Sequence, residues 1–214
     1  MSVVCSDGGE VQGPVVATAA TPLAAERAIG VLTSGGTALD AAIAAALGEC
    51  GELPMKCGLA GDVVALVQRR DGPLETLVSI GPGAVGHCVG ELEIVGPRSV
   101  GVPGAPGGYS ELASLGRRSL AELAAPAIEL AKKGPVWTPI AQQLTREAET
   151  VLRRYNGSIR YLPGDQVPEV GKRLPLPGVA AVIGDFVREG PRLFSGALGD
   201  RLRDRLGENC LLGG

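Results

Sequence analysis

The sequence offers few side chains that can act as a nucleophile, a general base or a metal ligand. Its one histidine, His87, stands in Gly86-His87-Cys88. A catalytic histidine needs an orienting carboxylate and a nucleophile beside it, and the sequence places neither next to His87. A structural or surface histidine is therefore the favoured interpretation.

The cysteines do not indicate a metal centre either. Five are present, an odd number, and no two form a C-x-x-C pair; they are Cys5, Cys50, Cys57, Cys88 and Cys210. With a single histidine in the chain, a Cys/His zinc site is not expected. We expect reduced, mostly buried thiols, no bound metal and no cofactor.

Two further features each have a functional and a structural interpretation. Cys57 follows Lys56, and a cation can depress a thiol pKa and make the thiolate reactive. No base or signature accompanies Cys57, so a buried thiol is favoured. The run from Gly104 to Gly108 precedes a helix, where an anion can bind, but it lacks the Gly-Lys-Ser/Thr of a P-loop. A turn is favoured there.

Composition excludes several partners. The 214 residues carry a net charge of -3, without the clustered Lys and Arg of a nucleic-acid footprint. No apolar stretch reaches the roughly 18–20 residues of a membrane span. The first residues lack the basic and apolar regions of a secretory signal. We expect one domain over residues 1–214, located in the cytoplasm, that binds neither nucleic acid nor a membrane.

The elements that must position any site begin with two capped helices and a hairpin. Thr21 is a good N-cap, and Pro22 suits the first helical position. Thr37 and Asp40 form a capping box before an almost wholly apolar segment, which predicts a helix buried on most sides. Apolar runs flank a polar turn at 69–73. These signals predict a strand at 15–19, helices at 22–32 and 38–47, and paired strands at 62–68 and 74–79.

The second half reads as mostly helical. Residues 81–108 are rich in Gly and Pro, which predicts loops with short strands. Ser119 and Glu122 form another capping box. We predict helices from 119 to 133, 138 to 155, 179 to 188 and 194 to 206, with a loop at 156–178. Strands that gather early and helices that gather late indicate a layered fold, mixed α/β or α+β, rather than regular βαβ repetition. The α+β class is the one we expect.

Four stretches, in this order, resemble the large subunit of gamma-glutamyltransferases, which are N-terminal-nucleophile hydrolases. The first runs from Val15 through Pro22-Leu23-Ala24-Ala25-Glu26 to Gly35-Gly36-Thr37-Ala38-Leu39-Asp40, where the family usually has Asn at position 37. The others are Glu52-Leu53-Pro54-Met55-Lys56-Cys57-Gly58-Leu59-Ala60-Gly61, then Val102-Pro103-Gly104-Ala105-Pro106-Gly107-Gly108 with the helix after Ser119, and Gly190-Pro191-Arg192-Leu193-Phe194-Ser195-Gly196. The resemblance spans residues 13 to 210.

The resemblance implies a partner chain. Members of the family are made as a precursor that cuts itself before a Thr, whose freed α-amine serves as base for its own hydroxyl. A second, small subunit starting with that Thr carries the catalytic groups, so no catalytic residue is expected in this chain. Both fragments build a four-layer αββα sandwich around a small-molecule substrate, and a dimer of such heterodimers is a further assembly to consider.

Two departures from the family pattern bear on the substrate. The family's Gly-rich run is broken here by Asp62 and Val63, for which drift in a structural turn is an equally good explanation. Where the family carries Asp-Phe-Arg-Glu, this chain reads Val78-Ser79-Ile80-Gly81. The family's Arg binds the α-carboxylate of the γ-glutamyl group, which Ile80 cannot do. We expect Ser79, Ile80, Gly81 and Asp62 to contact substrate, and ordinary γ-glutamyl recognition to be lost.

Two functions from different classes remain open at this point. One is an amide hydrolase or acyltransferase with a changed substrate, of a kind used in specialised metabolism. The other is a degenerate family member that binds or scaffolds without amide chemistry. The resemblance suggests Gly214 as the processing end. A Thr, Ser or Cys encoded after Gly214 would favour the enzyme, and any other residue the scaffold.

Overall fold

The computed structural model describes residues 3–4, 10–11, 15–69, 72–81, 95, 99, 101–155 and 160–206. His87, Gly214 and three cysteines (Cys5, Cys88 and Cys210) lie outside these ranges. The chain divides into two compact units. The first consists of residues 1–58 and 112–187, and the second consists of residues 59–111 and 188–214.

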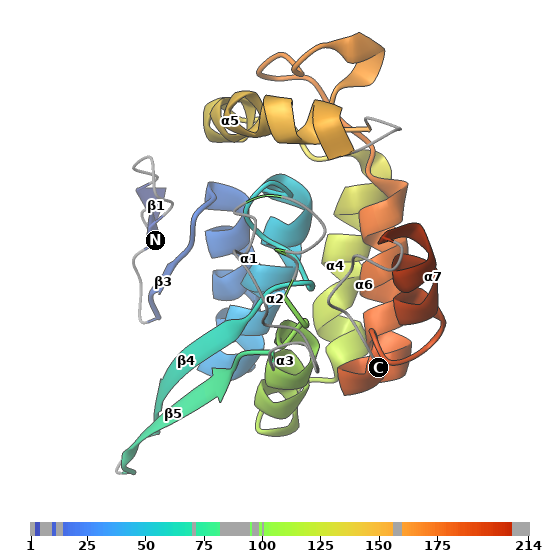
Figure 1. Ribbon diagram of the computed structural model, residues 1–214. Coiled ribbons are helices and arrows are strands. Elements are labelled where there is room, and N and C mark those ends of the chain that lie inside the picture. Colours follow the sequence, from blue (N-terminus) through green and yellow to red (C-terminus); the bar gives the residue numbers. More distant parts are fainter. Residues whose placement is uncertain are drawn as a thin grey trace. The chain divides into compact units, whose positions relative to one another are not determined.

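Helices packed side by side form the body of the first unit. Helix α1 (Pro22–Thr33) packs against α2 (Ala38–Glu52), and α2 packs against α4 (Leu120–Lys133), as Figure 1 shows. The side chains of α2 are mostly small and apolar, and many of them are buried. This burial confirms the expectation drawn from its apolar sequence. Before α1, three short strands form an antiparallel sheet in the order β1 (Val3–Val4), β2 (Glu10–Val11), β3 (Ala17–Thr18).

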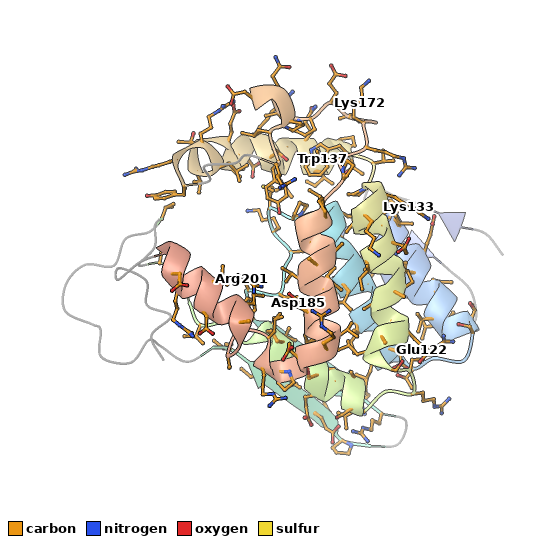
Figure 2. All side chains as sticks on the ribbon, turned by 90° about the vertical axis from the view of Figure 1, so that its right-hand side faces the viewer. Glu122, Lys133, Trp137, Lys172, Asp185 and Arg201 are labelled. Atoms are coloured by element: carbon orange, nitrogen blue, oxygen red, sulfur yellow. The ribbon has the colours of Figure 1, made fainter. Side chains whose placement is uncertain are left out.

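The predicted caps are present at the starts of these helices. The Thr21 hydroxyl accepts the N–H of Ala24 before α1. Reciprocal capping boxes start α2 and α4, from Thr37 with Asp40 and from Ser119 with Glu122. Figure 2 labels Glu122 in the first turn of α4 and Lys133 in its last. Each box satisfies N–H groups that the helix itself leaves without partners.

Asp40 does more than cap α2. Its carboxylate is fully buried and accepts the backbone N–H of Thr37 at 2.7 Å, of Arg117 at 3.1 Å and of Arg118 at 3.2 Å. A Cβ on Gly116 would overlap the Asp40 Oδ1 atom, so the 116–118 backbone closes directly over this carboxylate. Asp40 therefore ties the start of α2 to the connection that leads into α4.

The balance of forces on Asp40 makes this tie dependent on pH. Burial of the carboxyl by itself raises its pKa, but the hydrogen bonds from Thr37, Arg117 and Arg118 outweigh burial and hold the pKa below its ordinary value. A depressed pKa means that the charged form stabilises the fold. This stabilisation is present above the unfolded-state pKa and disappears as pH falls through the lower folded-state pKa.

We expect Asp40→Ala to lower the free energy of unfolding at pH 7 by about 3 kcal/mol, because several buried N–H groups lose a charged acceptor. Urea denaturation of the complete gene product at pH 7 and at pH 3 measures this. The difference from the parent should shrink at the lower pH. Glu129→Ala, on an exposed face of α4, is the control and should change stability by less than about 0.5 kcal/mol. An Asp40→Ala effect as small as that of the control would contradict this role.

A second core of the first unit surrounds Trp137. Its indole has no exposed surface and packs with Leu53, Ala141, Leu174 and Leu176; Figure 2 labels it. The backbone N–H of Trp137 donates to the Lys172 carbonyl at 2.7 Å, so the residues after α4 run beside the segment around 172. This core anchors α5 (Pro139–Tyr155) and the start of α6 (Pro177–Glu189), with a 3-10 turn at Pro163–Asp165 between them.

The second unit contains the predicted hairpin. Strands β4 (Val63–Gln68) and β5 (Leu74–Ser79) pair antiparallel, with the register running from Val63 opposite Ser79 to Gln68 opposite Leu74 (Figure 1). The unit also holds the start of α3 (Ala105–Ser114), a 3-10 turn at Gly190–Arg192, and α7 (Ala197–Leu206).

Because side chains alternate along a strand, the hairpin has two unlike faces. Val63 is buried, and Ala65 and Leu77 beside it are half-buried. The opposite face exposes four apolar side chains to between 60% and 69%: Val64, Leu66, Leu74 and Val78. We call these four residues the exposed hairpin face.

Three sequence-based boundaries were wrong. The strand predicted at 15–19 is only Ala17–Thr18, and the helix predicted from 194 begins at Ala197. Helix α2 continues beyond Leu47 to Glu52, through two glycines.

Helix α3 was missed altogether, because Gly107 and Gly108 in its first turn are poor helix formers. Tertiary packing explains it: a Cβ on Gly108 would lie 2.8 Å from the Ser79 Cβ and 3.0 Å from the Val63 Cβ. Among the described residues, no helix is long and apolar enough to cross a membrane.

Candidate functional site

Four of the five residues expected to contact substrate or mark the processing end lie together at one end of the hairpin. The register that pairs Val63 with Ser79 places Asp62, just before β4, next to Ile80 and Gly81, just after β5. The fifth residue, Gly214, lies outside the described residues. The resemblance pointed to positions 62 and 79–81 as separate departures, and the hairpin makes them neighbours.

A hydrogen bond joins the two sides of this end. The Gly81 N–H donates to the Asp62 Oδ1 atom at 3.0 Å. Asp62 is exposed and Gly81 is half-buried, so this bond lies at the surface of the unit.

The start of α3 is tied to the same place. The Ser79 hydroxyl donates to the Gly104 carbonyl at 2.8 Å. The Gly61 carbonyl accepts the N–H groups of Gly104 at 3.0 Å and of Ala105 at 2.8 Å. Hydrogen bonds thus connect the turn before β4, the end of β5 and the first turn of α3. We call the residues that make these bonds the strand-end clamp (Gly61, Asp62, Ser79, Gly81 and Gly104).

Two glycines of the strand-end clamp have no room for a side chain. A Cβ on Gly81 would overlap the Val102 carbonyl, and a Cβ on Gly104 would overlap the Ser79 carbonyl. Gly101, just outside the strand-end clamp, has nothing within 4 Å. The close approach of these backbone segments therefore requires glycine at 81 and 104. The same contacts fix Ser79 and Gly81, the two residues that flank Ile80.

Ile80 projects from this clamp with 60% of its surface exposed. It continues the line of Val64 and Val78, which pair across the strands. No Lys or Arg occurs between Glu75 and Pro97. The end of the hairpin thus presents a branched apolar side chain beside apolar neighbours, which suits an uncharged group and offers no guanidinium fork to a carboxylate.

The other candidates are less suited to chemistry. Burial raises the pKa of the half-buried Cys57 thiol to about 11, and the nearby Glu49 carboxylate adds to the effect. Its thiol also donates to Glu49. A thiol with a raised pKa is a poor nucleophile, so Lys56 does not activate it. Cys57 was expected to be a buried thiol, and the structure shows it half-buried.

The start of α3 is also not free to bind an anion. The N–H groups of Gly104 and Ala105 already donate to the Gly61 carbonyl, and Pro106 has none to offer. The structural role of 104–108 is therefore supported, but the predicted turn is wrong because Ala105 to Gly108 form the first turn of α3. In the described part of the chain, no group of three or more His, Cys, Asp and Glu side chains is placed to hold a metal ion.

No local pattern in the sequence pointed to two residues that contact the end of β5. Val102 and Gly104 contact the end of β5 across more than twenty residues of chain. The only clue was the density of glycine and proline between 101 and 108, which is as typical of an ordinary loop. Their contacts depend on where α3 packs, and the helix itself was not predicted.

Comparison with known proteins places these features in a family. The family model described as gamma-glutamyltranspeptidase matches residues 24–214. The chain is 32% identical over 208 residues to the acylase ACY 1 proenzyme of Pseudomonas sp. (strain V22), a match that covers 88% of this chain and 37% of that protein. The chain thus spans little more than a third of that relative's length.

Solved structures agree on the fold. Gamma-glutamyltranspeptidase of Helicobacter pylori superposes with a TM-score of 0.81 at 22% identity, covering 95% of this chain and 61% of that one. Cephalosporin acylase from Bacillus halodurans superposes with a TM-score of 0.75 at 28% identity, covering 86% and 37%. The α+β fold expected from the sequence is therefore confirmed, and this chain belongs to the gamma-glutamyltranspeptidase family.

Proposed function

We propose that this chain is the non-nucleophilic, large-subunit part of a self-processing amide hydrolase or acyltransferase whose acyl substrate lacks the α-carboxylate of a γ-glutamyl group. Family membership and a 32% identical acylase relative support amide chemistry. Ile80 carries the substrate part of the proposal. It stands where the family's carboxylate-binding Arg is expected, and it is exposed at the end of β5.

In this proposal the nucleophile comes from a second fragment. Its N-terminal Thr hydroxyl attacks the carbonyl carbon of the substrate amide, and its own α-amine takes the hydroxyl proton. The C–N bond breaks, the amine leaves with that proton, and the acyl group remains on Thr as an ester. Water or an acceptor amine then takes the acyl group and returns the Thr hydroxyl. The name of the relative, a proenzyme, supports such processing.

The contribution of this chain is to shape the acyl pocket. A substrate carboxylate placed against Ile80 would lose water without gaining a cation, which costs several kcal/mol at a desolvated site. An acyl group that places only apolar or neutral atoms against Ile80 does not pay this desolvation cost. The strand-end clamp holds Ile80 in place for this contact.

The exposed hairpin face supports the second fragment as partner. An isolated two-stranded hairpin is marginal in water, and a contiguous exposed apolar surface usually marks an interaction site. The relative is nearly three times as long as the region it shares with this chain. We propose that the second fragment of the same precursor packs on the exposed hairpin face and covers it.

The experiment that tests the substrate part uses Ile80→Arg. The parent enzyme should leave γ-glutamyl-p-nitroanilide almost uncleaved while releasing p-nitroaniline from butyryl-p-nitroanilide. Ile80→Arg should raise kcat/KM for the γ-glutamyl anilide at least about tenfold, because a charged contact to the carboxylate is restored. Ile80→Leu is the matched control and should leave the γ-glutamyl anilide uncleaved. Robust cleavage of the γ-glutamyl anilide by the parent would refute the substrate assignment.

A further inference from the structure

Two departures of this chain from the pattern of its family meet at one hydrogen bond. The resemblance described above implies glycines around position 62, where this chain has Asp62, and Arg-Glu where it has Ile80-Gly81. The two positions are 19 residues apart, yet the Gly81 N–H donates to the Asp62 carboxylate at 3.0 Å. A glycine at position 62 has no side chain with which to accept this N–H.

Contacts fix the backbone on both sides of this hydrogen bond. On the Asp62 side, the neighbouring Gly61 carbonyl accepts two N–H groups from the start of α3. On the other side, Gly81 follows directly after Ile80, and its backbone lies against the Val102 carbonyl. The Asp62 carboxylate thus links a fixed turn to the residue that immediately follows the exposed Ile80 side chain.

We propose that Asp62 is a positioning residue that fixes the direction of Ile80 and thereby helps to set which acyl group the site accepts. The effect on the acyl group rests on the function proposed above. The hydrogen bond between Gly81 and Asp62 is observed independently of that function. The role of Asp62 is that of a hydrogen-bond acceptor. An Asn at the same position retains a side-chain oxygen that can accept the Gly81 N–H.

Amide hydrogen exchange at Gly81 tests the link without reference to activity. In the complete gene product, Asp62→Ala should speed exchange of the Gly81 amide at least about tenfold, because an amide that has lost its acceptor no longer needs local opening before it exchanges. Asp62→Asn should remain within about threefold of the parent. Glu75→Ala is the matched control, because it removes a half-exposed acid from the same hairpin, and it should leave Gly81 unchanged. Equal exchange in Asp62→Ala and the parent would overturn the proposal.

Kinetics with butyryl-p-nitroanilide test the consequence for the site. Asp62→Ala should raise KM about fivefold with kcat nearly unchanged, because a misplaced pocket wall weakens binding of substrate and transition state alike. Asp62→Asn should restore the parental KM. In an Ile80→Ala background, Asp62→Ala should add no further rise in KM, since the side chain that it positions is gone.

The possible outcomes separate the two proposals. Faster Gly81 exchange with an unchanged KM would overturn the positioning role. Independent, additive effects of Asp62→Ala and Ile80→Ala would do the same. Failure of the parent enzyme to cleave any acyl anilide would count against the proposed function, and the exchange measurement would still decide whether Asp62 holds Gly81.

Discussion

Replacing Leu66 and Val78 together by Glu should prevent the chain from assembling with a second fragment of its precursor. Both side chains are on the exposed hairpin face, 69% and 61% exposed, and they are diagonal neighbours because Leu66 pairs with Thr76. Two carboxylates buried in an apolar interface without partners cost about 3 kcal/mol each or more. Each such cost weakens association roughly a hundredfold.

The hairpin itself should tolerate these changes, because the altered side chains do not contribute to the core of either unit. Val170→Glu is the matched control. It introduces the same charge at an apolar residue that is 49% exposed and lies in the other unit.

Size-exclusion chromatography with intact-mass analysis distinguishes the outcomes. The parent and Val170→Glu should each give two fragments that elute together. The double variant should give separated fragments or an uncut precursor. Co-elution of both fragments from the double variant, at parental yield, would show that the exposed hairpin face has another role.

Many helix starts and strand ends could be predicted from local sequence patterns. The capping boxes at Thr37 and Ser119 and the Thr21 cap each start a helix where expected. Strands β4 and β5 lie within a residue of their predicted ends. These features depend on interactions between residues close in sequence, so they can be predicted before the fold is known.

What could not be predicted depends on contacts between distant residues. Helix α3 contains two glycines that disfavour helix by themselves, and only its packing against Val63 and Ser79 accounts for it. The resemblance identified Asp62 and Ile80 as unusual for the family, but the hydrogen bond that links Asp62 to Gly81 requires the register of β4 and β5. Whether these residues contact a substrate stays a prediction.

We expect self-processing to depend on the hydroxyl of one Thr. In an N-terminal-nucleophile hydrolase the same Thr hydroxyl cuts the precursor and later attacks the substrate, and its α-amine exists only after the cut. Replacing that Thr by Ala removes both activities at once, so no cleaved fragment and no acyl transfer should remain. Replacing it by Ser should retain the cut, because a hydroxyl is still present.

Intact-mass analysis of the purified complete gene product, with N-terminal sequencing of each species, tests the central claim most directly. The account predicts two co-purifying species, the second of which starts with Thr, and a single uncut chain when that Thr is replaced by Ala. A single uncut chain from the parent gene, or cleavage that persists unchanged in the Thr→Ala variant, would contradict the assignment of this chain to a self-processing enzyme.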